Sequence, residues 1–582
     1  MTNRDFAKIF EQISEILELR RADRFRVLAY QKAAREIDHL GEDLDDLYRR
    51  GGLKALEAQA GIGTSVARKI EELIKTGSCR EYEKLKQQTA PVMLELLQIP
   101  GIGPRTAQKL YRNLKLKSLR DLEAAARQGR IQNLPGFKAK TEENILSALR
   151  SLRRRQKEAR YLLSTAEPIA EDIIQYLKRL PAVEKIDAVG SLRRRQETIG
   201  DIDLIVGARS PRRIVEYFCR YPRARQVLAR GRTKGSFLHE KMLRVDLEVL
   251  PLAAYGSLLQ HFTGSKEHNV ELRTMAKSRG YSISEYGVKD EKTGRMRKFQ
   301  DEAAVYRFLK MDCPPPEIRE GRGEIKAALS HHLPRLVTSR AIKGDLHVHS
   351  EASGDAAGRL EDIAAAAMKR GYQYLAVTEH TASLGVAQGL TGRQLLKHRQ
   401  KIQAVNRKIS GFRLLAGVEA DIRADGSIDI ADDILAQLDV VVASVHSALR
   451  QSEAVMTRRI LRAIANPHVD IIGHPSGRLL LQRDPYDAEW PEIFRAAARA
   501  GVALEVNAYP ERLDLNDVLI RSAIQFGAKL AINTDAHAPA QLALLPYGLA
   551  MARRGWAEAS DVINTFALPR LLKWLGRKGN IK

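Results

Sequence analysis

Short apolar runs in the carboxyl-terminal part of the chain repeatedly end on a histidine or an acidic residue. This pattern constrains the fold more than any other feature of the sequence. Ala- and Leu-rich segments with helical spacing separate the runs. The six runs are 345–349, 375–380, 415–419, 442–446, 471–475 and 532–537. With 502–507 they predict seven parallel strands in repeated βα units. The carboxyl ends of such strands meet at one mouth of a barrel, which brings the terminal side chains together.

The residue types at these strand ends predict a metal site. Imidazole and carboxylate groups without a thiolate suit Zn²⁺, Mn²⁺ or Fe²⁺. A lone histidine is more often a hydrogen-bonded polar residue than a metal ligand. Because six strand ends show the same pattern, metal ligation is favoured here. If Glu419 and Asp535 bridge neighbouring ions, the mouth can hold a cluster of two or three.

This block resembles the PHP (polymerase and histidinol phosphatase) domain. The resemblance implies nine ligands: His347, His349, Asp355, His380, Glu419, His446, His474, Asp535 and His537. Two motifs depart from the family pattern, since S-D-G reads Ser353-Gly354-Asp355 and T-D-H reads Thr378-Glu379-His380. The implied chemistry is phosphoester hydrolysis by a metal-bound hydroxide. PHP domains linked to polymerases are similar to 3′–5′ exonucleases that prefer Mn²⁺, and some process abasic sites or blocked 3′ ends.

Three aspartates in the middle of the chain predict a second metal site. Asp201 and Asp203 are two residues apart in a strand-like run, so both side chains project from one face. Asp246 lies in a later strand-like run, 243–249. Three converging carboxylates suit two Mg²⁺ ions about 3.5–4 Å apart, which would activate a 3′-hydroxyl and stabilise leaving pyrophosphate. The alternative, a polar strand edge, does not explain the preceding Gly190-Ser191 turn and Arg194, which suit a triphosphate.

The stretch from Val189 to Val206 resembles the nucleotidyltransferase core of polymerase beta and the bacterial family X DNA polymerases. The resemblance implies that the three aspartates bind Mg²⁺ or Mn²⁺, with Asp246 as the base for the primer hydroxyl. It assigns the triphosphate to Ser191, Arg194 and Gly200.

A further motif, 261–273, resembles the thumb-side nucleotide motif of the same family. The resemblance places Phe262 and Gly264 against the incoming sugar, Asn269 at the minor-groove edge of the base and Arg273 on the template strand. The chain differs from the family at His261, Lys266 and Glu248, where tyrosine, an acid and arginine are usual.

Glycine turns that open helices recur in the first 160 residues. They contain Gly61 and Gly63, Gly101 and Gly103, and Gly136. Such turns leave room for a phosphate and offer free N–H groups at the start of the next helix. They resemble helix-hairpin-helix motifs in the lyase and fingers regions of family X polymerases. The match places a possible Schiff-base lysine at Lys69, where the neighbouring cations Arg68 and Arg26 would favour the neutral amine; the alternative is a solvated or phosphate-binding lysine.

The charge distribution predicts where nucleic acid binds. The chain has a formal net charge of +25, and its first 340 residues carry 66 basic and 45 acidic side chains. An excess of this size favours a polyanionic partner over a merely solvated surface. No apolar run reaches the roughly 18 residues of a membrane helix. The three cysteines are far apart, so neither a disulfide framework nor a thiolate zinc site is indicated, and a cytoplasmic monomer is expected.

We therefore expect a multidomain α and α/β chain: a helical helix-hairpin-helix region, a mixed α/β palm and thumb, and a (β/α)7 PHP barrel. The expected domains are 1–85 (lyase-like), 86–155 (fingers), 156–252 (palm), 253–312 (thumb), 313–340 (proline-containing linker) and 341–582 (PHP). The expected function is DNA polymerisation from dNTPs on gapped or nicked DNA in base-excision repair, with nuclease processing of 3′ ends. The alternatives are a chiefly PHP-type nuclease with a DNA-positioning polymerase module, a non-catalytic scaffold and a small-molecule phosphatase.

Overall fold

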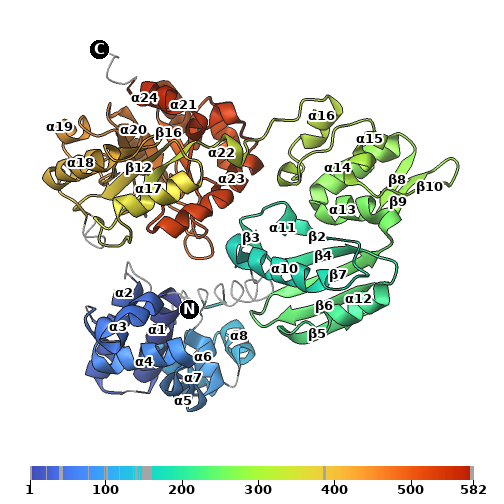
Figure 1. Cartoon of the computed structure of the whole chain (residues 1–582). Helices are drawn as coiled ribbons and strands as arrows, with labels where there is room; N and C mark the ends of the chain where they lie inside the picture. The colour runs from blue at the N-terminus through green and yellow to red at the C-terminus, as the bar shows by residue number, and fades with distance from the viewer. Residues whose placement is uncertain are drawn as a thin grey trace. The chain divides into compact units, whose positions relative to one another are not determined.

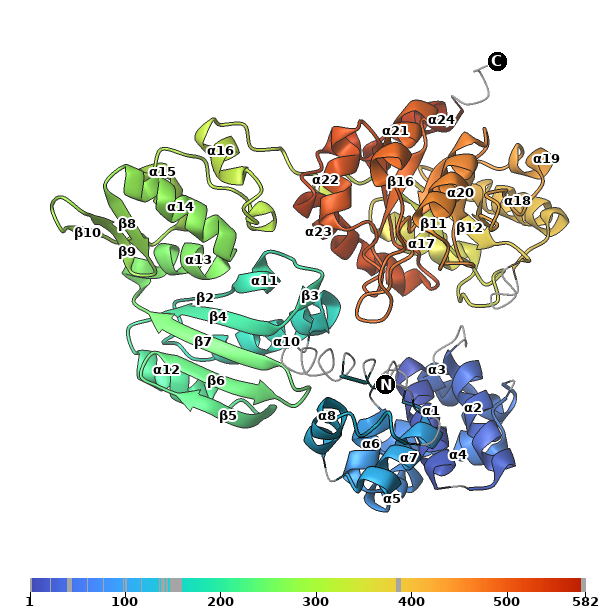
Figure 2. The same ribbon diagram turned by 180° about the vertical axis from the view of Figure 1, so that it is seen from behind.

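The chain divides into two compact units, Met1–Ala159 and Arg160–Lys582. The computed structural model describes residues 3–20, 22–38, 44–59, 61–76, 78–97, 99, 102–116, 118–134, 137, 142, 145–146, 160–383 and 389–576. Figures 1 and 2 show the helices and strands of each unit from opposite sides.

The first unit is helical in its described part, as the sequence predicts. Its helices are α1 (Asn3–Leu19), α2 (Arg24–Asp38), α3 (Leu44–Glu57), α4 (Thr64–Thr76), α5 (Arg80–Gln87), α6 (Pro91–Leu97), α7 (Pro104–Leu114) and α8 (Leu119–Arg127). One core forms around Phe10, Ile37 and Ile70, and a second around Leu96 and Leu110. The amphipathic helices bury their apolar faces in these two cores.

The second unit begins with a five-stranded sheet in the order β2-β4-β7-β6-β5. Its strands are β2 (Lys185–Ala188), β4 (Asp201–Gly207), β5 (Ala224–Arg230), β6 (Lys234–His239) and β7 (Arg244–Leu250). Strands β4 and β7 are parallel, and the other neighbours are antiparallel. Helices α10 (Leu163–Lys178) and α12 (Pro211–Phe218) share a core with this sheet, which we call the palm. The short pair β1 (Tyr161–Leu162) and β3 (Thr198–Ile199) adjoins it.

A smaller thumb follows the palm. It comprises α13 (Tyr255–Thr263), α14 (Lys266–Ser278), β8 (Tyr281–Ser284), β9 (Gly287–Asp290), β10 (Met296–Arg297) and α15 (Glu302–Phe308). The three successive prolines 314–316 then lead into the linker elements η2 (Pro316–Ile318), α16 (Glu324–Leu329) and η3 (Ser339–Ala341). Arg319, next to η2, is fully buried and donates to Glu302 of the thumb at 2.5 Å. The linker is therefore packed against the thumb.

Seven parallel strands form the barrel, which confirms the predicted number. They are β11 (Gly344–Val348), β12 (Tyr374–His380), β13 (Arg413–Asp421), β14 (Val440–Ser444), β15 (Ile471–Gly473), β16 (Ala503–Asn507) and β17 (Lys529–Asn533), in chain order. Val348 at the end of β11 also forms a parallel bridge with Ala536 after β17, so the sheet is nearly closed. The main helices around it are α17 (Leu360–Lys369), α18 (Gly392–Asn406), α20 (Glu453–Ala465), α21 (Trp490–Ala500), α22 (Asp517–Gln525) and α23 (Leu545–Arg554).

Both faces of the barrel strands are buried, which explains their continuous apolar sequences. Outward side chains such as Val377 pack against the helices. Inward side chains such as Leu415 and Val442 join Phe566 and Leu571 from the end of the chain. Leu571 belongs to α24 (Leu568–Leu575), and Phe566 follows η6 (Ile563–Thr565). The barrel is therefore filled by side chains and closed by η6 and α24.

Among the described residues, no helix combines the length and the apolar character that crossing a bilayer requires.

Candidate functional site

The structure brings together the three predicted aspartates of the palm. Asp201 and Asp203 lie on β4, and Asp246 lies on the parallel neighbour β7, directly opposite Asp203. One carboxylate oxygen from each lies within 4.8 Å of the others. Alternation along β4 points Asp201 and Asp203 to one face, and the shared register adds Asp246 to it.

The negative charges of these three aspartates favour the binding of cations. Burial, and then the charges of Asp201 and Asp246, raise the pKa of Asp203 to about 7. Burial and the charge of Asp246 also raise the pKa of Asp201. The only basic group that forms an ion pair with the trio among the described residues is Arg244, whose Nε lies 2.9 Å from Asp246 Oδ2. Hard carboxylate oxygens with incomplete neutralisation fit Mg²⁺ or Mn²⁺.

Gly190 makes room for this cluster. Its φ is +61°, and a Cβ placed on it would lie 2.6 Å from Asp203 Oδ2. The backbone N–H of Val189 donates to the carbonyl of Asp203 at 2.9 Å, which fixes the turn against β4. The turn opens α11 (Gly190–Arg193), so Ser191 directly follows the glycine that adjoins Asp203.

Arg194, predicted to hold the triphosphate, follows α11 and is anchored on two sides. Its Nε lies 3.0 Å from Glu320 Oε1, and its Nη1 donates to the carbonyl of Thr263 at 2.6 Å. Gly200 lies between β3 and β4, directly before the first aspartate.

The thumb-side residues Phe262, Gly264, Asn269 and Arg273 lie on α13 and α14 or in the turn between them. Asn269 Nδ2 donates to the carbonyl of His261 at 2.8 Å, which fixes its amide. Arg273 Nη2 lies 3.2 Å from His261 Nδ1. A Cβ on Gly264 would lie 3.1 Å from Arg194 Nη1, so this turn adjoins the predicted triphosphate residues. His261 therefore supports both polar residues of the motif.

The predicted ligands of the barrel gather at the carboxyl ends of its strands, with Glu419 at their centre. Glu419 Oε2 lies 2.9 Å from His380 Nδ1, 3.3 Å from His347 Nε2 and 3.6 Å from His349 Nε2. Its Oε1 lies 3.0 Å from His474 Nε2 and 3.3 Å from His446 Nε2. Burial alone would raise the pKa of Glu419, but the charges of surrounding histidines hold it well below its ordinary value.

Asp535 and Asp355 add two further carboxylates to the cluster. Asp535 Oδ1 lies 3.2 Å from His349 Nε2 and 3.5 Å from His347 Nε2. Asp355 Oδ2 lies 3.3 Å from His380 Nε2 and 3.6 Å from His537 Nε2. The one-residue shift in the motif 353–355 therefore still brings the Asp355 carboxylate to the histidines.

These residues fit a cluster of metal ions. Three groups have ligand atoms close enough to share an ion: His347, His349, Glu419 and Asp535; His380, Glu419 and His446; and His349, His380 and His537. Several buried polar atoms of these residues have no hydrogen-bond partner in the described part of the chain, among them His347 Nε2, His446 Nδ1 and Asp355 Oδ1. Nitrogen and carboxylate donors without thiolates suit Mn²⁺, Zn²⁺ or Fe²⁺.

Glu505 on β16 belongs to the candidate site, and the sequence analysis missed it. It is fully buried, and its Oε1 lies 2.8 Å from His347 Nδ1. Its Oε2 accepts from the backbone N–H of His474 at 2.7 Å. A carboxylate in this position orients an imidazole toward a metal. The signal in the sequence was the single acid within the apolar run 502–507.

The glycine turns are described only in part. Gly61 has a φ of +78°, Gly63 precedes α4, and Gly103 caps α7, while Gly101 and Gly136 lie outside the described residues. A Cβ on Gly61 would lie 2.4 Å from Glu36 Cγ, and the open side of Gly63 and Gly103 has nothing within 4 Å. Gly63 and Gly103 therefore leave the backbone accessible.

Lys69 on α4 is paired with an acid, contrary to the environment expected from Arg68 and Arg26. Its Nζ lies 3.0 Å from Glu81 Oε2 and donates to Ser65 Oγ at 2.9 Å. Burial alone would lower the pKa of Lys69, but the hydrogen bond to Glu81 raises it overall. Arg26 pairs with the same carboxylate. The ammonium form of Lys69 is therefore favoured in this structure.

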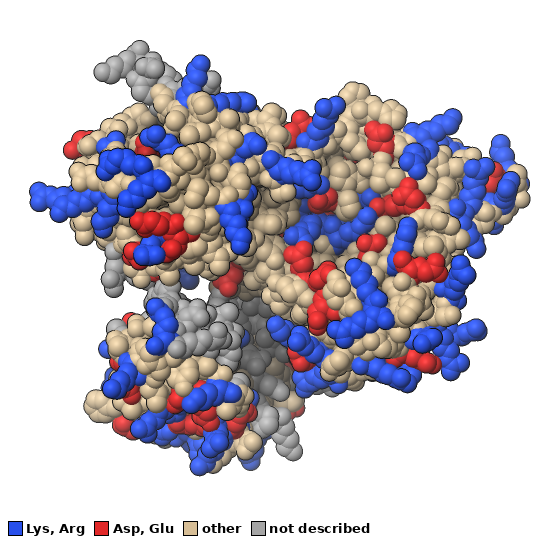
Figure 3. All heavy atoms as spheres, viewed as in Figure 1, with Lys and Arg blue, Asp and Glu red and all other residues tan. Residues whose placement is uncertain are grey.

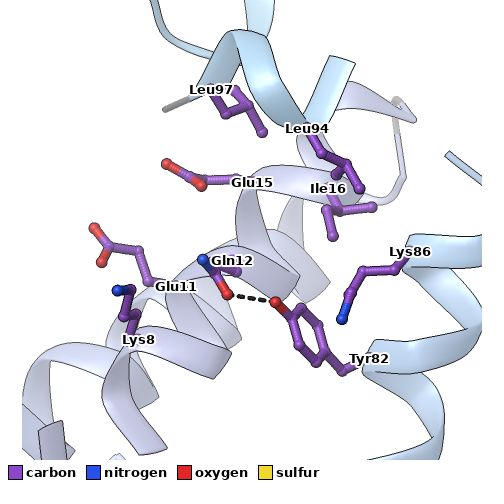
Figure 4. A pocket seen from close by; sticks show the side chains of 9 residues that line it. All are labelled: Lys8, Glu11, Gln12, Glu15, Ile16, Tyr82, Lys86, Leu94 and Leu97. Carbon is purple, nitrogen blue, oxygen red and sulfur yellow. Dashed lines mark hydrogen bonds between the residues drawn. The ribbon is translucent and has the colours of Figure 1, made fainter. Parts of the chain in front are cut away.

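Other surface features do not coincide with the predicted sites. Figure 4 shows a pocket of the first unit between α1, α5 and α6, where Tyr82 donates to Gln12 and none of the predicted site residues lies. Figure 3 shows Lys and Arg side chains spread over the visible face of both the palm–thumb part and the barrel.

Four family models match the chain. A helix-hairpin-helix domain matches residues 1–79, a SAM-like helix-hairpin-helix tandem 93–151, the DNA polymerase beta thumb 258–320 and the PHP domain 345–509. These matches agree with the helical first unit, the thumb and the barrel.

Relatives cover either the whole chain or a part of it. A Bacillus subtilis (strain 168) protein named DNA polymerase/3′-5′ exonuclease PolX is 36% identical over 579 residues, which are 99% of this chain and 100% of the relative. A probable phosphatase of Thermoanaerobacter sp. (strain X514) is 30% identical over 38% of this chain and 89% of its own. A probable phosphatase of Shewanella sediminis (strain HAW-EB3) is 28% identical over 40% and 94%.

Proposed function

Because this chain belongs to the bacterial PolX family of DNA polymerases with a polymerase beta-like thumb and a PHP domain, we propose that it extends DNA 3′ ends and also trims them. The observation that carries the polymerase proposal is the convergence of Asp201, Asp203 and Asp246 within 4.8 Å. The histidine cluster around Glu419 supports the nuclease proposal.

In the polymerase reaction, the three aspartates would hold two Mg²⁺ ions, which supply charge stabilisation and lower the pKa of the primer 3′-hydroxyl. Asp246 accepts the proton of that hydroxyl. The 3′-oxygen then forms a bond to the α-phosphorus of the dNTP, and the bond to the bridging oxygen breaks to release pyrophosphate. Ser191, Arg194 and the backbone at Gly200 bind the triphosphate that becomes this leaving group.

The thumb-side residues orient the incoming nucleotide. Phe262 and the turn at Gly264 contact its sugar, and Asn269 donates to the minor-groove edge of its base. Arg273 binds the template strand. The hydrogen bond from Asn269 to the carbonyl of His261 supports this role, because it fixes the amide before the nucleotide arrives.

In the nuclease reaction, nine residues of the barrel would hold Mn²⁺, Zn²⁺ or Fe²⁺ ions, which supply the nucleophilic hydroxide and stabilise charge on the phosphate. Glu419 and Asp535 would supply carboxylate oxygens to these ions. Glu505 holds the ring of His347 through Nδ1, so that Nε2 points to the cluster. The substrate is a phosphodiester at a DNA 3′ end or a blocked 3′ end.

The cellular role that we propose is short-gap filling in base-excision repair, by a cytoplasmic monomer. The turns at Gly61, Gly63, Gly101, Gly103 and Gly136 would hold the DNA backbone. Binding should weaken steeply with salt, because phosphate contacts release counterions. Lys69 would act as a lyase nucleophile only after its ammonium leaves Glu81 and loses a proton, so borohydride trapping on a nicked abasic duplex tests it separately.

The test of this function is a gapped duplex with a clean or a blocked 3′ end. Asp203→Ala should abolish extension and keep nuclease activity, and His349→Ala should do the reverse. A wild-type protein that extends no primer with Mg²⁺ or Mn²⁺ would contradict the polymerase proposal.

A second candidate is a PHP phosphoesterase whose polymerase module mainly positions DNA. It is favoured by the probable phosphatases that this chain matches over most of their length. Under this alternative the wild type processes DNA ends or phosphorylated metabolites, and Asp203→Ala changes nothing but DNA binding.

A further inference from the structure

Glu320, in the segment after the proline run, joins the palm to the barrel. Its Oε1 accepts from three donors: Arg194 Nε at 3.0 Å, Gln196 Nε2 at 2.9 Å and Arg554 Nη1 at 2.9 Å. Arg554 is the last residue of α23, which lies beside α11 of the palm in both ribbon views (Figures 1 and 2). Donors from the palm and the barrel therefore share one carboxylate oxygen of the linker residue Glu320.

Arg554 binds the palm with one end of its guanidinium and the barrel with the other. Its side chain is almost fully buried, and its Nη1 also donates to the backbone carbonyl of Arg194 at 2.7 Å. Its Nη2 donates to Asp517 Oδ2 at 2.7 Å, on α22. Arg322 pairs with the same Asp517 at 3.0 Å. A buried arginine that is fixed at both ends of its guanidinium is a rigid connection between barrel and palm.

Arg194 is in turn held by hydrogen bonds to the linker, the barrel and the thumb. Its Nε donates to Glu320, and its Nη1 donates to the carbonyl of Thr263 at the end of α13. Its backbone carbonyl accepts from Arg554. Thr263 directly precedes the turn at Gly264, where the sugar of the nucleotide is proposed to lie. Barrel, linker and thumb thus meet on the residue proposed for the triphosphate.

We propose that Glu320 and Arg554 are positioning residues for Arg194, so that the affinity of the polymerase site for a nucleoside triphosphate depends on the barrel domain. The inference rests on the proposed polymerase function. It assigns the barrel a second role that needs none of its metal-binding residues.

The physical argument is preorganisation. A guanidinium that is already fixed loses little conformational freedom when a triphosphate binds. Arg554 also neutralises Glu320. Without Arg554, Glu320 loses one of its three donors and the backbone carbonyl of Arg194 loses a hydrogen bond, so the guanidinium of Arg194 is held less firmly. The nucleotide should then bind more weakly.

We expect Arg554→Ala to raise the KM for dNTP about 10-fold, within the range of roughly 5- to 150-fold that couplings between sites usually span. The kcat should change less than about 2-fold, because the aspartates and the primer are untouched. Nuclease activity at the barrel and the affinity for gapped DNA should match those of the wild type.

Arg553→Ala is the matched control. Arg553 neighbours Arg554 on α23 and also binds the linker, through Glu317 Oε1 at 2.8 Å and the carbonyl of Val337 at 3.0 Å. Among the described residues, it forms no ion pair or side-chain hydrogen bond with Arg194 or Glu320. If the arginines of α23 only stabilise the packing of the barrel on the linker, both variants should have the same KM for dNTP. If Arg554 positions Arg194, the KM for dNTP rises only in Arg554→Ala.

The experiment uses the full chain, with single-nucleotide insertion, nuclease activity and melting temperature measured for each variant. If Arg554→Ala loses nuclease activity or melts early, Glu320→Gln replaces it, because it keeps the volume and removes the charge that holds Arg194; several-fold weaker dNTP binding is expected. An unchanged KM for dNTP in a folded variant overturns the inference. Failure of the wild type to insert a nucleotide overturns the proposed function instead, so the two failures are distinguishable.

Discussion

His347 Nδ1 lies 2.8 Å from Glu505 Oε1, so a buried carboxylate at the centre of β16 fixes the ring of a histidine on β11. We expect Glu505→Gln to weaken Mn²⁺ binding by about 10- to 100-fold, the usual cost of losing such a partner. A Mn²⁺ titration of nuclease activity measures this, and primer extension should not change. Asp484→Asn, an exposed acid of the same domain, is the control and should leave the titration unchanged.

The pKa of Asp203 predicts how the polymerase site responds to pH. Burial and the neighbouring carboxylates raise the pKa of Asp203 to about 7 in the metal-free protein. Below pH 7 a cation must therefore displace a proton, and above it the site is already ionised. The Mg²⁺ concentration that gives half-maximal extension should rise as the pH falls from 8 to 6. An equal Mg²⁺ requirement at both pH values would contradict this assignment.

Gly190→Ala should reduce extension at least about 100-fold while the protein stays folded. The φ of +61° costs roughly 1–2 kcal/mol for a residue with a side chain. The added Cβ would also lie 2.6 Å from Asp203 Oδ2 and displace that carboxylate. Gly280→Ala is the control, because Gly280 has a φ of +79° and nothing within 4 Å. It should lose similar stability and keep extension; equal activity in the two variants would refute the proposed role of Gly190.

Glu302→Gln should destabilise the second unit by about 3–5 kcal/mol, since it breaks a buried ion pair. Glu302 lies 2.8 Å from Arg193 Nη2 and 2.5 Å from Arg319 Nη1. Urea unfolding should show this loss. Glu216→Gln removes an exposed pair with Arg212 and should cost less than about 1 kcal/mol.

The same carboxylate predicts stability in acid. Burial alone would raise the pKa of Glu302, but the charges of Arg319 and Arg193 lower it to about 2. Because this folded-state pKa lies below the unfolded one, the contribution is complete above about pH 5 and is lost as the pH falls toward 2. The stability difference between wild type and Glu302→Gln should shrink over that interval, and a constant difference would argue against the pairing.

The sequence predicted the seven-stranded barrel and the convergence of both clusters of candidate metal ligands because those residues follow local rules. Alternation along β4 placed Asp201 and Asp203 on one face, and the shared mouth of the barrel gathered the strand-end histidines. Glu505 was not predicted as a site residue, since a single acid inside an apolar run has no periodic partner. Lys69 shows the same limit, because its partner Glu81 comes from the following helix and reverses the charge environment expected from Arg68.

Contacts between distant segments were the least predictable. Arg554 meets Glu320 across 234 positions of the chain. Neither residue lies in a motif, and arginine at the end of a helix is ordinary in sequence. Only the packing of α23 against the linker reveals the pair.

Phe566 and Leu571 fill the barrel at the end where its strands begin, and the histidine cluster lies at the end where the strands stop. A DNA strand cannot pass through this filled core. We therefore expect the 3′ end to reach the cluster, and the released nucleotide to leave it, at the same rim, so the nucleotide must clear that rim before the next phosphodiester takes its place.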